Sequence, residues 1–254
     1  EAARNGLGIA LYSLGRLYED GRGTGRDYEA AAGYYREAAL KEEPRSQGRL
    51  GYLYETGRGV PQSLSDAADW YRKAAGRGDA FAEYRLGRLH LSGQGAQRNQ
   101  QRAEELFRKA AAQGSPGALY ELGIICLRKQ SFEKAFRLLR KAAELGNAGA
   151  MKSLGDMCRD GRGVRRSAQN AMQCYRAAAA RGNAGAASGI GDIYFFWGKY
   201  TEAAAWYCRA AERGYAEAQR KLGQMYEKGY GVTRNHGEAL KWFHLADENK
   251  ASPW

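Results

Sequence analysis

The sequence predicts an all-α fold built as a solenoid of about seven helix pairs, and two regularities support this. A Leu-Gly dipeptide, Ile-Gly in one case, recurs at steps of 32 or 36 residues, with its first residue at Leu14, Leu50, Leu86, Leu122, Leu154, Ile190 and Leu222. An aromatic or apolar pair follows each dipeptide 16 or 20 residues later, beginning at Tyr34, Trp70, Leu106, Leu138, Cys174, Trp206 and Trp242. Periods of this size are typical of solenoids, in which each unit buries its apolar face against its neighbours.

The repeat divides the chain into seven units, which we expect to form a single solenoid over residues 7–250. The units are 7–42, 43–78, 79–114, 115–146, 147–182, 183–214 and 215–250. Before them, Ala2, Ala3 and Gly6 match the Ala-Ala-x-x-Gly that ends later repeats. We therefore expect residues 1–6 to be the end of a preceding repeat helix, so that the chain begins inside an earlier repeat, and residues 251–254 to be a tail.

Capping residues set the predicted helix boundaries. Side chains that accept from the free N–H groups of a helix start precede the first helices at Asp79, Ser115, Asn147 and Asn183. The same residue types precede the second helices at Asp27, Ser63, Asn99, Ser131, Ser167 and Asn235, and only Lys199 breaks this series. Glycines that permit a left-handed conformation close the second helices at Gly78, Gly114, Gly146, Gly182 and Gly214.

A Gly-x-Gly turn joins the two helices of five units, beginning at Gly21, Gly57, Gly93, Gly161 and Gly229. Glycine loops can bind phosphate, but that use requires a preceding strand and a following Lys-Ser/Thr, which these turns lack. We expect tight turns between helices. The fourth and sixth units are four residues shorter and lack the turn, and the sixth has Phe195, Phe196 and Trp197 in its place.

These features together resemble the Sel1-like repeat, a relative of the tetratricopeptide repeat. The shared pattern is Ala-x-Ala-x-x-x-Leu-Gly-x-x-Tyr-x-x-Gly-x-Gly-Val, followed by Ala-x-x-Trp-Tyr-x-x-Ala-Ala-x-x-Gly, and it covers essentially the whole chain. The resemblance implies a right-handed superhelix of antiparallel helix pairs, with the first helices lining a concave groove. Proteins similar to this are adaptors in bacterial envelopes and secretion systems, in endoplasmic-reticulum quality control, and as immunity proteins against secreted toxins.

The resemblance thus implies a non-catalytic scaffold that binds one protein or peptide in its groove. We expect an exported, periplasmic bacterial protein, either an immunity protein or an adaptor of the envelope. Tetratricopeptide geometry implies groove positions at Tyr12, Arg16, Tyr52, Phe81, Tyr84, Arg88 and Tyr120, and charged ones at Asp156 and Asp192. Tyr and Arg are common anchors of interfaces. The alternative for the four tyrosines is that they pack along one another between first helices.

The aromatic triplet of the sixth unit is the sharpest departure from the repeat. Phe195, Phe196 and Trp197 cannot all point into the core of one helix, so we expect at least one to be exposed for a partner. The alternative is that they fill the space left by the missing turn.

The net charge of +12 raises a second hypothesis, a binder of nucleic acid or acidic polysaccharide. Basic residues recur directly after the aromatic pair and form a ridge, at Arg36, Arg72, Arg108, Arg140, Arg176, Lys73, Lys109, Lys141 and Arg209. A repeated position of this kind is more often a solvated face, so nucleic acid is the less favoured partner. No apolar run is long enough to cross a bilayer.

Signs of catalysis are weak, and we expect no enzyme, cofactor or metal. Ser131 and Lys134 match the Ser-x-x-Lys of penicillin-recognising enzymes, a remote hydrolase alternative, but neither Ser-Asp-Asn nor Lys-Thr-Gly occurs. The three histidines form no His-Glu-x-x-His motif. Three of the four cysteines are predicted to be in the core, at Cys126, Cys158 and Cys174, where a bond between the last two stays open. Cys208 is predicted to be the accessible thiol.

Overall fold

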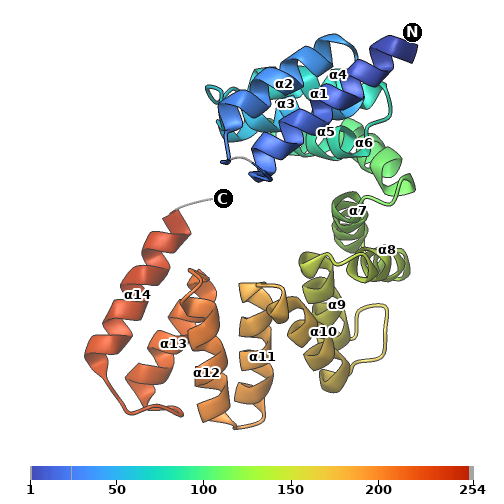
Figure 1. The fold of residues 1–254 in the computed structure, drawn as a ribbon. Helices are drawn as coiled ribbons and strands as arrows, with labels where there is room; N and C mark the ends of the chain where they lie inside the picture. The colour runs from blue at the N-terminus through green and yellow to red at the C-terminus, as the bar shows by residue number, and fades with distance from the viewer. Residues whose placement is uncertain (1, 24, 252–254) are drawn as a thin grey trace. The chain divides into compact units, whose positions relative to one another are not determined.

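The structure is a computed structural model that describes residues 2–23 and 25–251. Every regular element within these ranges is an α-helix (Figure 1). The first helices of the seven repeats are α1 (Ala2–Asp20), α3 (Pro44–Thr56), α5 (Ala80–Ser92), α7 (Pro116–Arg128), α9 (Ala148–Asp160), α11 (Ala184–Phe196) and α13 (Ala216–Lys228). The second helices are α2 (Tyr28–Leu40), α4 (Leu64–Gly76), α6 (Gln100–Ala112), α8 (Phe132–Glu144), α10 (Ala168–Ala180), α12 (Tyr200–Ala211) and α14 (His236–Ala251). The all-α prediction is confirmed.

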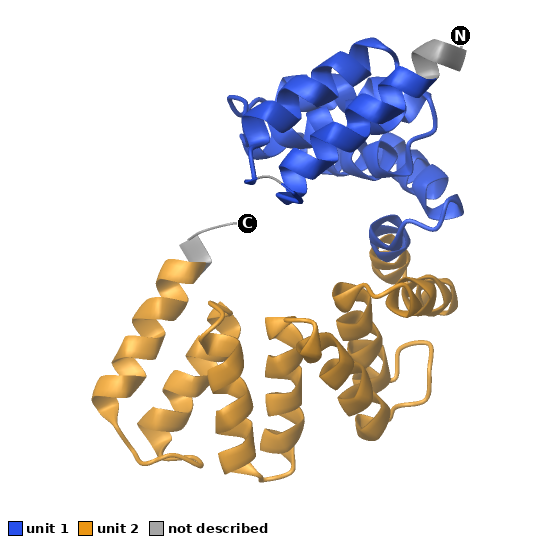
Figure 2. Ribbon diagram, viewed as in Figure 1, with its two compact units in different colours: residues 1–122 blue, residues 123–254 orange. Residues whose placement is uncertain are grey.

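The chain forms two compact units, residues 1–122 and residues 123–254 (Figure 2). In each unit the two helices of a repeat pack together, as α3 does on α4 and α11 on α12. Second helices also pack on the first helix of the next repeat, as α4 does on α5 and α12 on α13. This is the solenoid pattern, with the core lying between helices of successive repeats.

Most of the predicted caps form as expected, and two short turns are the exceptions. The side chains of Asp79, Asn147 and Asn183 accept backbone N–H groups of the first helices at 2.7 to 2.8 Å. The prediction for Ser131 is wrong, because its side chain makes no cap bond. Its backbone, at φ −85° and ψ 67°, matches Lys199 of the other short turn and differs from the extended caps elsewhere. The shortened turn therefore enters α8 with a backbone geometry different from that of the turns whose caps form.

The Gly-x-Gly turns have a steric reason for both glycines. Gly57 and Gly59 have φ values of +66° and +67°, where an L side chain is strained. A Cβ atom on Gly59 would also lie 2.1 Å from the carbonyl oxygen of Tyr28, at the start of α2. Gly231 meets the backbone of Tyr200 in the same way. These two turns therefore contact the start of the second helix in the preceding repeat.

The signature Leu-Gly dipeptide builds the core, with one exception at α1. Leu50 and Leu53 of α3 are fully buried, against α2 of the preceding repeat. The equivalent Leu14 and Leu17 of α1 are 40% and 42% exposed. Residues 2–6, which the sequence predicts as the end of a preceding helix, continue α1 without a break. One face of α1 is thus a partly exposed apolar stripe.

The cysteines differ in part from the prediction. Cys158 is buried, while Cys126 and Cys174 are only half-buried, and all four are free thiols in the structure. Cys208 is half-buried, with part of its side chain against the core that includes Tyr207, so it is less exposed than the sequence predicts. Burial raises its pKa to about 11, and a hydrogen bond from the thiol to Glu212 adds to the effect. A raised pKa lowers the thiolate fraction at neutral pH, and the thiolate is the nucleophilic form.

Candidate partner-binding site

A recurring polar contact joins a buried tyrosine of a second helix to a carboxylate of the first helix, beside an Arg or Lys side chain. In the first compact unit, the hydroxyl of Tyr71 on α4 donates to Glu55 of α3 at 2.6 Å. Arg85 of the next repeat donates to the same carboxylate oxygen at 2.7 and 2.8 Å. Tyr35 donates likewise to Glu19. Burial and the neighbouring carboxylate raise the pKa of Tyr71 well above its usual range, so the hydroxyl stays protonated as a donor.

The second compact unit repeats this contact with the carboxylate one turn earlier on the helix. Tyr207 of α12 donates to Asp192 of α11 at 2.7 Å, and Lys221 of α13 donates to the same oxygen at 2.7 Å. Tyr175 donates to Asp156 at 2.7 Å, where Lys152 completes an ion pair at 2.7 Å. Asp156 and Asp192, which the sequence predicts as groove residues, are therefore hydrogen-bonded to side chains of the scaffold itself.

Two of the predicted anchors of the first compact unit lie together on α3 and α5. The rings of Tyr52 and Phe81 meet edge-on with centroids 6.1 Å apart. The guanidinium groups of Arg49 and Arg85 lie over Phe81 at 5.4 and 5.9 Å. These four side chains line a cavity of about 510 Å³ with Glu19 and other polar residues. The two arginines are absent from the sequence prediction, which considered other positions of the repeat.

The remaining predicted residues of the first compact unit are scattered. Tyr12 and Arg16 hydrogen-bond each other on α1 at 3.5 Å, and Arg16 also pairs with Asp20 at 3.0 Å. Tyr84 packs against Phe107 at 6.1 Å. The other two lie elsewhere, Arg88 exposed on α5 and Tyr120 half-buried on α7.

The four tyrosines give a mixed answer to the two sequence hypotheses. Tyr12, Tyr52 and Tyr84 are half-buried, and the ring of each meets another aromatic residue, Tyr35, Phe81 and Phe107 respectively. The ring of Tyr84 also lies over Gly117 of α7. These three tyrosine rings therefore pack within the scaffold, and each leaves only part of its surface for a partner.

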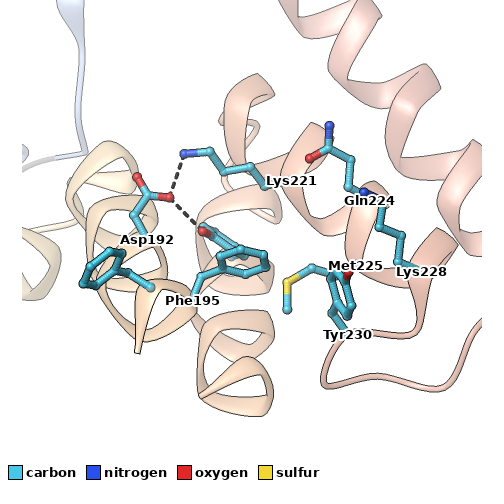
Figure 3. A pocket seen from close by; sticks show the side chains of 9 residues that line it. Asp192, Phe195, Lys221, Gln224, Met225, Lys228 and Tyr230 are labelled. Carbon is cyan, nitrogen blue, oxygen red and sulfur yellow. Dashed lines mark hydrogen bonds and ion pairs between the residues drawn. The ribbon is translucent and has the colours of Figure 1, made fainter. Parts of the chain in front are cut away.

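A cavity with apolar and charged lining residues lies in the second compact unit, between α11 and α13 (Figure 3). Its volume is about 580 Å³, within the range of pockets that bind small ligands or a few side chains. Phe195 and Met225 lie on facing sides, and Asp192 with Lys221 forms the polar end. We call this cavity the α11–α13 pocket, and its lining is Asp192, Phe195, Phe196, Tyr207, Lys221, Gln224, Met225, Lys228 and Tyr230.

An aromatic patch adjoins the pocket, and we define it as Phe195, Phe196, Tyr200 and Tyr230. The rings of Tyr200 and Tyr230 stack at 5.1 Å, and Phe195 meets them edge-on at 5.1 and 6.1 Å. Phe196 is 81% exposed. Both sequence hypotheses for this segment thus describe part of it, since Phe195 packs in the space beside the short turn while Phe196 points to solvent. Trp197 lies outside the pocket lining, half-exposed, with its ring edge-on to Tyr194 at 5.9 Å.

Part of this site could have been found by the same comparison of repeats. Tyr230 is the middle residue of its Gly-x-Gly turn, a position that holds Arg22, Arg58, Gln94 and Arg162 in the other repeats. That departure resembles the one at Phe196, and the sequence prediction does not include it. Met225 and Lys228 carry no such signal, because both residue types are ordinary at their positions.

The basic ridge is exposed but largely occupied by local contacts. Arg72, Arg108 and Arg140 each pair with a carboxylate on their own helix. Lys73 and Arg209 lie over the rings of Trp70 and Trp206 at 4.2 and 4.6 Å. These contacts fit the interpretation of the ridge as a solvated face. Elsewhere in the second compact unit, Lys134 of the Ser-x-x-Lys segment is exposed on α8.

Two kinds of site were sought over the described ranges. Residues 2–23 and 25–251 contain no group of three or more His, Cys, Asp or Glu side chains placed to hold a metal ion. Within the same ranges, no helix has the length and apolar character needed to cross a membrane.

The family model for the Sel1 repeat matches seven segments of the chain. The segments are 8–42, 44–79, 80–115, 117–147, 148–183, 190–215 and 216–246. The chain belongs to the Sel1 repeat family. A comparison with curated protein sequences gave no match.

Solved structures of Sel1 repeat proteins resemble this chain closely. A protective antigen of uropathogenic Escherichia coli with an SLR fold is 31% identical with a TM-score of 0.72, over 97% of this chain and 55% of that one. The chain thus spans about half the length of that relative. A Sel1 repeat protein from Oxalobacter formigenes is 28% identical with a TM-score of 0.80, over 95% of this chain and all of that one. The immunity protein PA5088 from Pseudomonas aeruginosa is 22% identical with a TM-score of 0.61, over 82% and 83% of the two chains, a likeness of fold alone. The Sel1 repeat fold is one suited to binding proteins.

Proposed function

We propose that this Sel1 repeat protein is a non-catalytic scaffold that binds a partner protein through the aromatic patch and the α11–α13 pocket. The observation that supports this most directly is the exposure of Phe196, at 81%, beside a cavity with apolar walls. An exposed cluster of aromatic side chains is characteristic of an interaction surface, because a monomer gains nothing by leaving it in water. Ring contacts among Phe195, Tyr200 and Tyr230 restrict part of the cluster, which lowers the entropy lost on binding.

A protein partner fits this surface better than an anionic polymer does. A polymer would need free positive charge, whereas the arginines of the ridge at positions 72, 108 and 140 are paired with carboxylates on their own helices. The patch supplies aromatic area instead, and aromatic residues are the usual anchors of protein interfaces.

For the biological role, we propose an exported bacterial protein of the periplasm, acting either in immunity against a secreted effector or as an adaptor of the envelope. The support is the shared fold of the bacterial Sel1 proteins described above, among them an immunity protein from Pseudomonas aeruginosa. Fractionation of the source cells with an antibody to the chain tests the location. Recovery in the cytoplasmic fraction alone would contradict export. Co-expression with toxins encoded beside the gene tests immunity, and survival unchanged for every such toxin would contradict it.

The binding role is tested by affinity capture from the native source, with cross-linking to locate the contact. We expect Phe196→Ala to reduce capture of the partner at least about tenfold, as loss of an interface anchor does. Leu240→Ala is the matched control, since Leu240 is an exposed apolar residue of α14 outside the pocket lining. Capture that is equal for wild type, Phe196→Ala and Leu240→Ala would show that the patch is not the binding surface.

A further inference from the structure

The α11–α13 pocket has two chemically different ends, and from them we infer the class of segment that it takes. We propose that it binds a loop or tail of the partner protein in which a large apolar side chain stands next to an acidic one. The apolar side chain enters between Phe195 and Met225, and the carboxylate pairs with Lys228. This inference rests on the proposed function and adds the chemistry of the partner.

The apolar part of the pocket combines a half-exposed ring with a buried, adaptable thioether that an entering side chain reaches by a small shift. Phe195 is already fixed, because its ring meets Tyr200 and Tyr230 at 5.1 and 6.1 Å. Met225 is 2% exposed and faces it from α13, with a thioether that adapts to the shape of a ligand. A volume of about 580 Å³ admits an aromatic or long aliphatic group with neighbouring backbone.

The polar end near α12 has little capacity left for a ligand. Asp192 accepts from Tyr207 and from Lys221, each at 2.7 Å. Lys221 also pairs with Glu217 at 2.7 Å, so its charge is already balanced. A ligand cation or anion placed there would have to break an existing pair.

The other charged side chain of the pocket is available. Lys228 stands at the last residue of α13, and its ammonium lies 5.9 Å from the ring centroid of Tyr230. No carboxylate in the described part of the chain lies within 4.0 Å of it. A carboxylate of the partner at this position would gain a charge-assisted hydrogen bond without displacing any protein group. Gln224 on the same helix lines the pocket and adds an amide donor.

A protein segment, rather than a small apolar acid, accounts for the surface outside the cavity. Phe196 is 81% exposed and Tyr200 is 36% exposed. A ligand confined to the cavity would leave most of the Phe196 ring in water. A polypeptide that continues beyond its anchor residue covers it and gains the apolar area.

The test is a selection of random peptides displayed on phage against the full chain, followed by fluorescence anisotropy with the enriched peptides. We expect the peptides to share an aromatic or large aliphatic residue beside Asp or Glu. Phe196→Ala and Lys228→Glu should each raise Kd about tenfold or more. Both side chains are exposed, so these variants keep the fold, which circular dichroism checks. The matched controls are Leu240→Ala and Lys134→Glu, both exposed and outside the pocket lining, and we expect them to leave Kd unchanged.

A charge exchange makes the assignment of Lys228 specific. A peptide whose acidic residue is replaced by Lys should lose affinity for wild type and regain it with Lys228→Glu. Methyl-labelled methionine gives a second readout, because only one of the four methionines, Met225, lines the pocket. Its methyl signal should shift on binding while those of Met151, Met157 and Met172 stay in place.

The outcomes separate this inference from the proposed function. Enriched peptides that keep their affinity for Phe196→Ala and Lys228→Glu would overturn the pocket assignment and leave a protein-binding scaffold. Peptides that lack an acidic residue, or the absence of any enriched peptide, would also overturn it. Loss of partner capture with Phe196→Ala but not with Lys228→Glu would uphold the proposed function and refute the acidic element.

Discussion

The contact between Tyr71, Glu55 and Arg85 allows us to estimate what one of its hydrogen bonds contributes to the free energy of unfolding. Replacing Tyr71 by Phe removes only the hydroxyl, which donates to the Glu55 carboxylate at 2.6 Å. A hydrogen bond to a charged group contributes about 1.5–3 kcal/mol. Because the Glu55 side chain is 21% exposed, and keeps Arg85 at 2.7 Å, the lower end of that range applies. We expect Tyr71→Phe to lower the free energy of unfolding by about 1.5 kcal/mol.

Urea unfolding, followed by circular dichroism, measures this change from the shift of the midpoint at constant slope. The matched control is Tyr54→Phe, whose hydroxyl accepts a long bond of 3.3 Å from Arg36 at an exposed position, and whose effect should stay below about 0.5 kcal/mol. A double-mutant cycle of Tyr71→Phe with Glu55→Gln isolates the pair. A coupling energy of zero, with Tyr71→Phe no more costly than Tyr54→Phe, would refute the reasoning.

Two further predictions concern the glycines and the tyrosine hydroxyls. Gly51→Ala should destabilise the protein by about 1–3 kcal/mol, because the new Cβ would lie 2.8 Å from the ring of Tyr71. Gly33→Ala in α2 has open space around it and should stabilise the protein by up to about 1 kcal/mol. The same urea unfolding checks both variants, and equal effects would contradict the packing argument. The four buried tyrosines that donate to carboxylates have folded-state pKa values raised by burial above the unfolded value of about 10. Their contribution is complete below pH 10 and is lost as the pH rises toward the folded pKa values, so stability should fall above about pH 10. Tyrosinate absorbance should then rise in two steps, the second coincident with unfolding, and a single step before any loss of helix would contradict this.

The sequence predicts the scaffold well because the repeat encodes it locally. A capping side chain acts within three residues, as Asn147 does on the N–H of Ala150. Positive φ follows from Gly in a fixed turn. Where the turn is shortened the prediction fails, as at Ser131, because the geometry of the connection changes and not the residue type.

The candidate site is harder to predict because its contacts join residues far apart in the chain. Lys221 and Asp192 are 29 residues apart and in different repeats. One clue was nevertheless available within the chain. The third repeat has Phe107 and Leu91 at the positions of Tyr71 and Glu55, so the hydroxyl and the carboxylate are lost together. A comparison of pairs of positions across the repeats would have revealed the contact.

The partly exposed apolar stripe of α1 has a consequence for how the first compact unit unfolds. In the 254-residue chain studied by itself, the first repeat packs on one neighbouring repeat, so it has one interface energy fewer than a repeat between two neighbours. Leu14 and Leu17, at 40% and 42% exposed, bury less apolar surface than the fully buried Leu50 and Leu53 of α3. Amide hydrogen exchange should therefore show α1 and α2 opening as a separate event, at lower free energy than α3 and α4. Melting would then advance along this unit as a front from one end, and the deuterium uptake of successive helices would record its passage.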